Sequence, residues 1–391
     1  MESTTTITNA PGLLTLPRDI LVMLPNYLHN IEDYMNVAST CRDLRDCMSM
    51  AQPHTILCLA WESSRGFFRP SPLFLVCATA RQLGDWARES DANEAELAAG
   101  MPCGTGHLMD LALREKQIGL NMEDIRELYK LRFSVINPVA DIVDQCVGEQ
   151  WYATPNFWNG GVDDAYTIDA DPDETLFHLA SYGELFGSDF EPFLDPSLSN
   201  RRRLKVETRL EFVKYCIPDF ATECFKSARG ITLSDGTLDP RRALVIHDDG
   251  PYAPDEKGNR ARNCDNSLAL EWTMKSTRWR PRWKQARLDA GADPDFADEL
   301  AYDEGTEEGS HWKQNMLEIM MQCQGLKGLG MILPGTDLAE SYKPKIREWR
   351  EKIQHIEEMP KLTKVGRWVT HEYPDLWHDL HICTSGYVAG T

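Results

Sequence analysis

The chain has 391 residues and a formal net charge of −20, from 41 Lys and Arg against 61 Asp and Glu. This balance excludes a protein that binds nucleic acid mainly by neutralising phosphates. The 42% hydrophobic and 26% charged composition is that of a globular protein, which excludes a fibrous or wholly disordered chain. No apolar run approaches the ~20 residues that span a bilayer. The start, MESTTTITNAPG, has no positive charge before an apolar stretch, so we expect neither a secretory leader nor a membrane partner.

Eleven cysteines are scattered along the chain, and none forms a C-x-x-C pair. An odd number of cysteines in a chain long enough to bury a large core predicts reduced thiols, and therefore a cytoplasmic or nuclear location. No period of about 20 to 50 residues is visible, which argues against solenoids and propellers.

The first fifty residues predict three short helices. Pro17 suits a first helical turn, because its missing N–H costs nothing there. The positions that follow on one helical face are Ile20, Leu21, Leu24, Tyr27 and Leu28. A second helix is expected after Asp33 and a third through Leu44 toward Met48. Three such helices cannot bury a core of their own, so we expect a half-exposed module that needs a partner.

The same residues carry a recognisable order of motifs. These are Leu16-Pro17, Asp19-Ile20-Leu21, Tyr27-Leu28, Glu32-Asp33 and Cys41-Arg42-Asp43-Leu44-Arg45. This order resembles the F-box, over residues 14 to about 48, and the rest of the chain is similar in style to fungal F-box proteins. The resemblance implies docking on the adaptor subunit of a cullin–RING ubiquitin ligase. The remaining chain would select the protein that is ubiquitinated.

The resemblance also implies which residues bind the adaptor. They are Leu16, Pro17, Ile20, Leu21, Leu24, Leu28, Val37, Cys41 and Leu44. Pro25 departs from the pattern, because many F-boxes have a bulky apolar residue there. A proline within a helix removes a backbone donor and costs ~3 kcal/mol or kinks the helix, which would weaken or re-angle docking. The alternative is an amphipathic helical hairpin that packs on its own domain.

We expect a flexible tail over residues 1–13, an F-box-like module over 14–50, and a mainly helical receptor domain without repeats over 55–391. The fold class is therefore mainly α. Apolar residues recur at spacings of three and four in several stretches, which predicts core-facing helices: 125–135, ended by Asn137-Pro138; 139–146; 206–217; 312–323; and 346–356, starting near Pro344. The runs 56–61, 73–78 and 243–247 fit either short strands or buried helical turns.

One long stretch has acids and aromatics without any cation. No Lys or Arg lies between Arg132 and Arg201, while residues 141–200 carry thirteen acids and ten aromatic rings. Such a surface could recruit a basic segment of a protein substrate whose identity the sequence does not give. The residues proposed for this are Trp151, Trp158, Asp163, Asp164 and Tyr166. The alternative is a solvated acidic loop whose aromatic rings belong to the core, with part of its charge matched by Arg201–Arg203 or by 275–287.

Two further patterns concern a basic segment and a possible set of metal ligands. Six cations at 275–287 adjoin nine acids at 289–308, which favours intramolecular neutralisation over recognition of a phosphate group. His378 and His381, three apart, could share a helical face and bind zinc with Cys383. The alternative, a buried C-terminal segment, is preferred, so neither metal nor cofactor is expected.

No Walker A, G-x-S-x-G or H-E-x-x-H motif occurs. The sequence therefore favours a non-catalytic substrate receptor of an SCF-type ligase. The alternative is a helical enzyme or small-molecule binder whose N-terminal helices only pack on the domain.

Overall fold

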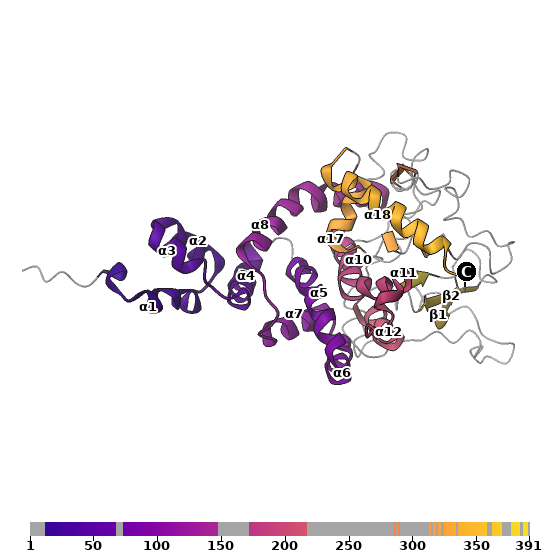
Figure 1. Cartoon of the computed structure of the whole chain (residues 1–391), viewed down its shortest axis with the longest axis horizontal. Helices are drawn as coiled ribbons and strands as arrows, with labels where there is room; N and C mark the ends of the chain where they lie inside the picture. Colours follow the sequence, from indigo (N-terminus) through magenta and orange to yellow (C-terminus); the bar gives the residue numbers. More distant parts are fainter. Residues whose placement is uncertain are drawn as a thin grey trace, which may run out of the picture.

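The computed structural model describes residues 12–67, 73–147, 172–216, 324–333 and 335–357, nine single residues between 285 and 321, and the backbone of three strands after residue 361. The described chain is mainly α-helical, as the sequence predicts. It forms a small N-terminal lobe that projects from a larger helical body (Figure 1).

The N-terminal lobe consists of short helices. In chain order they are η1 (Leu13–Thr15), α1 (Arg18–Val22), η2 (Leu24–Tyr27), α2 (Ile31–Thr40) and α3 (Arg42–Met48). Asn30 begins α2, because its side chain accepts a hydrogen bond of 2.7 Å from the backbone N–H of Asp33. We call residues 12–50 the N-terminal module.

Pro25 divides the first predicted helix into two. The sequence suggested one apolar face running from Ile20 to Leu28, but α1 ends at Val22 and a 3₁₀ turn, η2, begins at Leu24. Pro25 has no N–H for the carbonyl of Leu21, and its ring is incompatible with a continuing α-helix at that point. The break turns Tyr27 away from the apolar face, so its side chain is 71% exposed.

The body begins with helices that lead away from the module. They are α4 (Pro53–Phe67), α5 (Leu73–Glu89), α6 (Asp91–Gly100), η3 (Met101–Cys103), α7 (Thr105–Arg114), α8 (Met122–Leu131), the π-helical turn η4 (Arg132–Ile136) and α9 (Asn137–Val147). The apolar runs 56–61 and 73–78 are thus buried helical turns, whereas 243–247 lies outside the described residues.

Asn137 and Pro138 do not end a helix, contrary to the sequence prediction. The N–H of Asn137 bonds to the carbonyl of Arg132, which is a π-helical spacing, and α9 starts at Asn137. Proline is tolerated in the first turn of a helix. The wider π turn therefore carries the chain past Pro138 without a break, and the predicted apolar stripe of Ile125, Leu128, Leu131 and Val135 is buried throughout.

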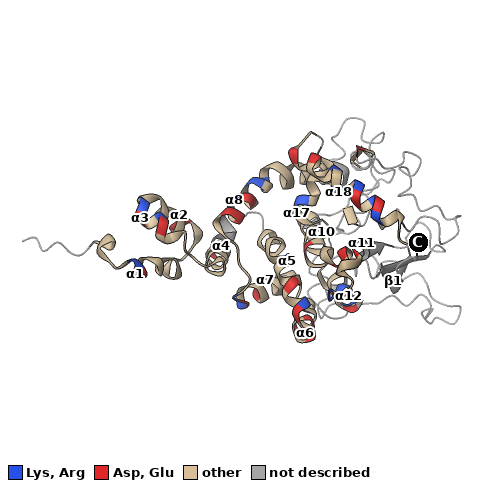
Figure 2. Cartoon of the chain, in the orientation of Figure 1, with Lys and Arg blue, Asp and Glu red and all other residues tan. Residues whose placement is uncertain are grey.

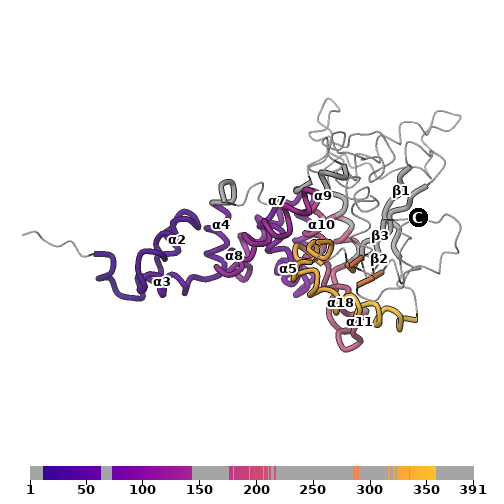
Figure 3. Tube along the Cα trace, turned by 90° about the horizontal axis from the view of Figure 1, so that it is seen from above, coloured from indigo at the N-terminus to yellow at the C-terminus, as the bar shows by residue number. Residues whose placement is uncertain are grey.

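A second set of helices closes the body. It comprises α10 (Pro172–Phe186), η7 (Gly187–Phe190), α11 (Glu191–Leu194), η8 (Pro196–Leu198), α12 (Val206–Cys216), α17 (Gly325–Gly328), η11 (Leu329–Ile332) and α18 (Asp337–Gln354). Helix α10 packs along α5, and α18 contacts α11 (Figure 3).

Helix α18 begins seven residues before the predicted start near Pro344. The Thr336 hydroxyl accepts a hydrogen bond of 3.2 Å from the N–H of Ala339, and Asp337 and Glu340 lie in the first turn. These favourable N-terminal interactions hold a helix that includes Pro344 in its interior. Ile346 and Ile353 are buried, as their spacing predicts.

The last described elements are three antiparallel strands in the order β1 (Leu362–Val369), β2 (Trp377–Cys383) and β3 (Gly386–Ala389). Leu362 pairs with Cys383, and the register of β1 shifts between Lys364 and Gly366. The helical interpretation of 378–383 is therefore wrong, because that backbone is extended.

The buried apolar side chains that the structure describes form one large core and one small cluster. The small cluster, Leu21, Leu44 and Cys47, lies inside the N-terminal module. Ile31, Tyr34 and Met48 of the same module belong to the large core, together with Ile56 and Leu57 of α4 and the buried faces of α5 and α10. Of the helices within the described ranges, none has both the length and the apolar character that a bilayer span requires.

Candidate functional site

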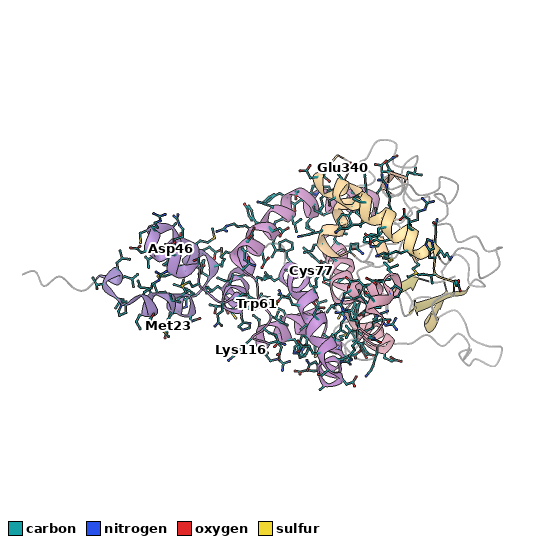
Figure 4. The ribbon with its side chains drawn as sticks, viewed as in Figure 1. Met23, Asp46, Trp61, Cys77, Lys116 and Glu340 are labelled. Carbon is teal, nitrogen blue, oxygen red and sulfur yellow. The ribbon has the colours of Figure 1, made fainter. Side chains whose placement is uncertain are left out.

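Exposed large apolar side chains are concentrated in the N-terminal module. Within the described residues, ten such side chains are exposed, and eight belong to this module. The eight are Leu13, Leu14, Leu16, Ile20, Met23, Tyr27, Met35 and Met50; Met23 is labelled in Figure 4. A concentration of this kind on a soluble surface marks an interaction site more often than scattered single side chains do.

The structure sorts the predicted adaptor-binding residues into three groups. Leu16, Pro17 and Ile20 are exposed. Leu21 and Leu44 are buried in the small cluster and shape the module from within. Partial burial is found for Leu24, Leu28, Val37 and Cys41. The outer group can contact a partner directly, whereas the inner groups fix the shape of the surface.

Six exposed side chains were not among the predicted adaptor-binding residues: Leu13, Leu14, Met23, Tyr27, Met35 and Met50. Met35 interrupts the otherwise polar face of α2, which is a signal that the sequence offered. The exposure of Met23 had no such signal, because it depends on the break that Pro25 introduces after α1.

Hydrogen bonds fix the module internally and tie it to the body. Within the module, the Tyr34 hydroxyl donates a hydrogen bond of 2.6 Å to the carbonyl of Met48. The Thr55 hydroxyl, on α4, donates one of 3.1 Å to the Asn26 side chain. Burial raises the pKa of Tyr34, and the charge of Arg126, on α8, opposes that rise. The apolar surface is therefore presented by an anchored module.

One Cys–His pair lies close to this module. The Cys58 sulfur is 3.7 Å from Nε2 of His54, and Nδ1 of His54 is 2.9 Å from the carbonyl of Ile118. Burial and the neighbouring Glu62 raise the pKa of Cys58, which favours the thiol over the reactive thiolate. The pair therefore has the properties of a structural contact rather than of a nucleophilic dyad.

The described acids of the segment 141–200 are mostly neutralised within the chain. Arg81, on α5, lies 2.8 Å from Glu184. Asp189 is buried between Arg88, at 2.7 Å, and Arg209, at 3.0 Å. Arg201 pairs with Glu191. Arg202 pairs instead with two acids of α6, which lie outside this segment. The proposed substrate residues of this segment, Trp151, Trp158, Asp163, Asp164 and Tyr166, lie outside the described residues.

The sequence predicts that the cations of 275–287 neutralise the acids of 289–308. Asp289 is the one acid of 289–308 that the structure describes. Asp289 lies 3.1 Å from Nζ of Lys343, on α18, and accepts a hydrogen bond from Gln285. The hydrogen bonds from Gln285 and Lys343 lower the pKa of Asp289. The cation that pairs with this acid thus comes from α18, and the cations of 275–287 lie outside the described residues.

His378, His381 and Cys383 lie on β2 rather than on a helix, and their side chains are outside the described part of the chain. Among the side chains that the structure does describe, no three His, Cys, Asp or Glu residues are grouped so that they could hold a metal ion.

The described site is thus an apolar surface, built by short helices and joined to a helical body by the Asn26–Thr55 hydrogen bond and by core residues of the module. A search of protein-family models, of curated proteins and of solved structures found no match to this chain.

Proposed function

We propose that this protein is a non-catalytic substrate receptor of an SCF-type cullin–RING ubiquitin ligase, with the N-terminal module docking on the adaptor subunit. The observation that carries the proposal is the exposure of Leu16, Pro17 and Ile20 on a module whose sequence resembles the F-box. Apolar side chains that stay in water gain free energy when a partner covers them, at about 25 cal/mol per Å².

The arrangement of the module supports this role. The exposed residues precede or belong to α1, at the end of the molecule that points away from the body (Figure 1). Anchoring of α2 and α3 through Ile31 and Met48 leaves that end uncovered. An anchored surface loses less conformational freedom on binding than a flexible segment does, which favours tight docking.

A second candidate function rests on the same core residues. Because Ile31, Tyr34 and Met48 belong to the large core, the module is partly integrated into the body. This continuity is what a helical enzyme or small-molecule binder would show if its first helices served only for packing. The two candidates differ in what they require of the exposed residues, since packing alone does not need Ile20.

A single substitution separates the two candidates. The Ile20 side chain is 46% exposed, so Ile20→Glu places a charge in a surface that adaptor binding would desolvate. We expect it to weaken retention of the purified adaptor at least about tenfold. The thermal unfolding midpoint of the full chain should stay unchanged, because little of this side chain is buried. Co-elution on size-exclusion chromatography and calorimetric titration measure the two effects.

Phe133→Glu is the matched control, because Phe133 is a similarly exposed apolar residue outside the module. It should retain the adaptor as the wild type does. If wild-type protein does not retain the adaptor at micromolar concentrations, the proposal is wrong and the packing alternative stands.

A further inference from the structure

A second exposed surface lies on α8 and the π-helical turn η4. Tyr129 and Phe133, at 47% and 55%, are the two exposed large apolar side chains beyond residue 50 among the side chains that the structure describes. Their ring centroids are 5.1 Å apart in an edge-to-face arrangement. Two adjacent rings in water form a ready-made apolar contact area rather than two isolated side chains.

Cations accompany these rings. Arg126 and Lys130 are exposed and lie four residues apart on α8, and Tyr129 and Phe133 repeat the same spacing. Residues four apart on a helix are neighbours on one face. We call Arg126, Tyr129, Lys130 and Phe133 the α8 stripe.

The acids next to the stripe are already engaged. Oδ2 of Asp124 accepts a hydrogen bond from the N–H of Asn121 as part of a capping box. Oε1 of Glu127 lies 2.7 Å from Nζ of Lys327, on α17. Glu123 is exposed but sits in the first turn, where its charge favours the helix N-terminus. Arg126 and Lys130 lie on the same helix as these acids, and Figure 2 shows blue and red turns alternating along α8.

The backbone at the stripe is irregular. The π-helical turn covers Arg132–Ile136, and the Ser134 hydroxyl donates a hydrogen bond of 3.0 Å to the carbonyl of Lys130. Single π turns within helices occur frequently at functional sites. Here the turn contains Phe133, so it sets the position of that ring relative to Tyr129.

From this geometry we infer that the α8 stripe is a docking surface for an acidic protein segment that carries an apolar or aromatic side chain between its carboxylates. The two cations match the carboxylates, and the rings match the apolar side chain. Nucleic acid fits the stripe less well, because a chain with a net charge of −20 offers only a few cations here against the many phosphates of a polyanion. The segment would belong to the ligase substrate only if the proposed function holds, but binding itself does not depend on that function.

A copolymer of glutamate and tyrosine is a suitable probe, with poly-glutamate as the polymer that lacks rings. The full-length protein should bind the copolymer at micromolar concentrations in ~50 mM salt and more weakly at ~150 mM, because salt screens the charge pairs. Poly-glutamate should bind at least about tenfold more weakly, since it leaves the rings of the stripe uncovered. Fluorescence anisotropy of labelled polymer measures both affinities.

Two variants test the stripe directly. Tyr129→Ala/Phe133→Ala should weaken copolymer binding about tenfold, and Lys130→Glu should weaken it by a similar factor in low salt. Lys116→Glu is the matched control, because Lys116 is another exposed lysine, labelled in Figure 4, whose substitution changes the net charge equally. It should weaken binding less than about twofold.

Several outcomes would overturn the inference. They are no binding of the copolymer to the wild-type protein, equal losses in Lys116→Glu and Lys130→Glu, or tighter binding of a single-stranded oligothymidylate than of the copolymer. Adaptor retention should be unchanged in the stripe variants. Loss of the adaptor in these variants would show that α8 is part of the adaptor surface, which contradicts the inference and leaves the proposed function intact.

Discussion

Asp189 shows how an acid in the cation-free segment 141–200 is neutralised by arginines from other parts of the chain. It lies in a segment without cations, yet its carboxylate contacts Arg88 and Arg209 and accepts a hydrogen bond from the N–H of Leu204. Removing one partner of such a buried pair leaves an uncompensated charge, which costs about 3–5 kcal/mol. Arg88 comes from α5, 101 residues earlier in the chain. The spacing of charges along a sequence does not reveal such a partner. Part of the negative charge of residues 141–200 is therefore matched by arginines from other parts of the chain.

Tyr342 gives a pH dependence whose direction can be worked out. Burial, reinforced by Glu184 and opposed by Arg81, raises the pKa of Tyr342 to about 12, from 10 for an exposed tyrosine. The folded protein therefore keeps the proton more tightly than the unfolded chain does. The contribution of the protonated Tyr342 to the free energy of unfolding is complete below pH 10 and is lost as the pH rises from 10 to 12.

Tyr342→Phe removes this dependence. The difference in unfolding free energy between wild type and variant should be constant from pH 8 to pH 9 and should shift in favour of the variant from pH 10 upward. Urea unfolding at a series of pH values measures it. A difference that does not change up to pH 11 would contradict the buried position of the hydroxyl.

At the scale of elements, the close packing of α5 on α10 depends on Gly84. A Cβ atom at Gly84 would lie 2.5 Å from the carbonyl oxygen of Leu185, so the two helices would have to move apart. We expect Gly84→Ala to lower the unfolding free energy by about 1–3 kcal/mol, in spite of the higher helix propensity of alanine. Chemical denaturation measures the change.

Gly106→Ala, on α7, is the matched control, because no atom lies within 4 Å of its Cβ position. It should leave the unfolding free energy unchanged or raise it by less than the ~1 kcal/mol of a helix interior, because Gly106 is the second residue of α7. A stabilising effect of both substitutions would show that α5 and α10 are less closely packed than described.

Which elements could be predicted depends on the range of the interactions that determine them. Helices with a long apolar stripe, such as α8 and α18, follow from spacing alone. Their ends do not, because the start of α18 depends on the Thr336 cap and the passage of Pro138 depends on the π turn. The module residues were predicted from motifs, but only tertiary packing decides that Leu21 and Leu44 are buried while Leu16 and Ile20 are exposed.

At the scale of the whole molecule, the module and the body share one core. Ile31, Tyr34 and Met48 pack into the cluster that also contains Ile56 and Leu57 of α4. A chain that starts at residue 51 would expose these α4 residues to water. We expect this deletion to bind the dye ANS and to lower the unfolding midpoint, because each large apolar side chain left exposed costs about 1.5–3 kcal/mol. Dye fluorescence and thermal unfolding measure the two effects.

The point variant Ile20→Glu provides the comparison, because it alters the outer surface without opening the core. It should show neither effect. Unchanged dye binding in the deletion would mean that the body folds independently of the first fifty residues, and the module would then be a separate domain.

The uncovered apolar side chains of the module also govern how the isolated protein behaves at high concentration. A net charge of −20 keeps separate molecules apart by long-range repulsion, while the apolar lobe draws them together at short range. Added salt shortens the reach of the repulsion to ~3 Å at 1 M and leaves the apolar attraction in place. Ionic strength therefore acts as a control on colloidal stability: dilute buffer favours single particles, and concentrated salt favours reversible clustering through the module.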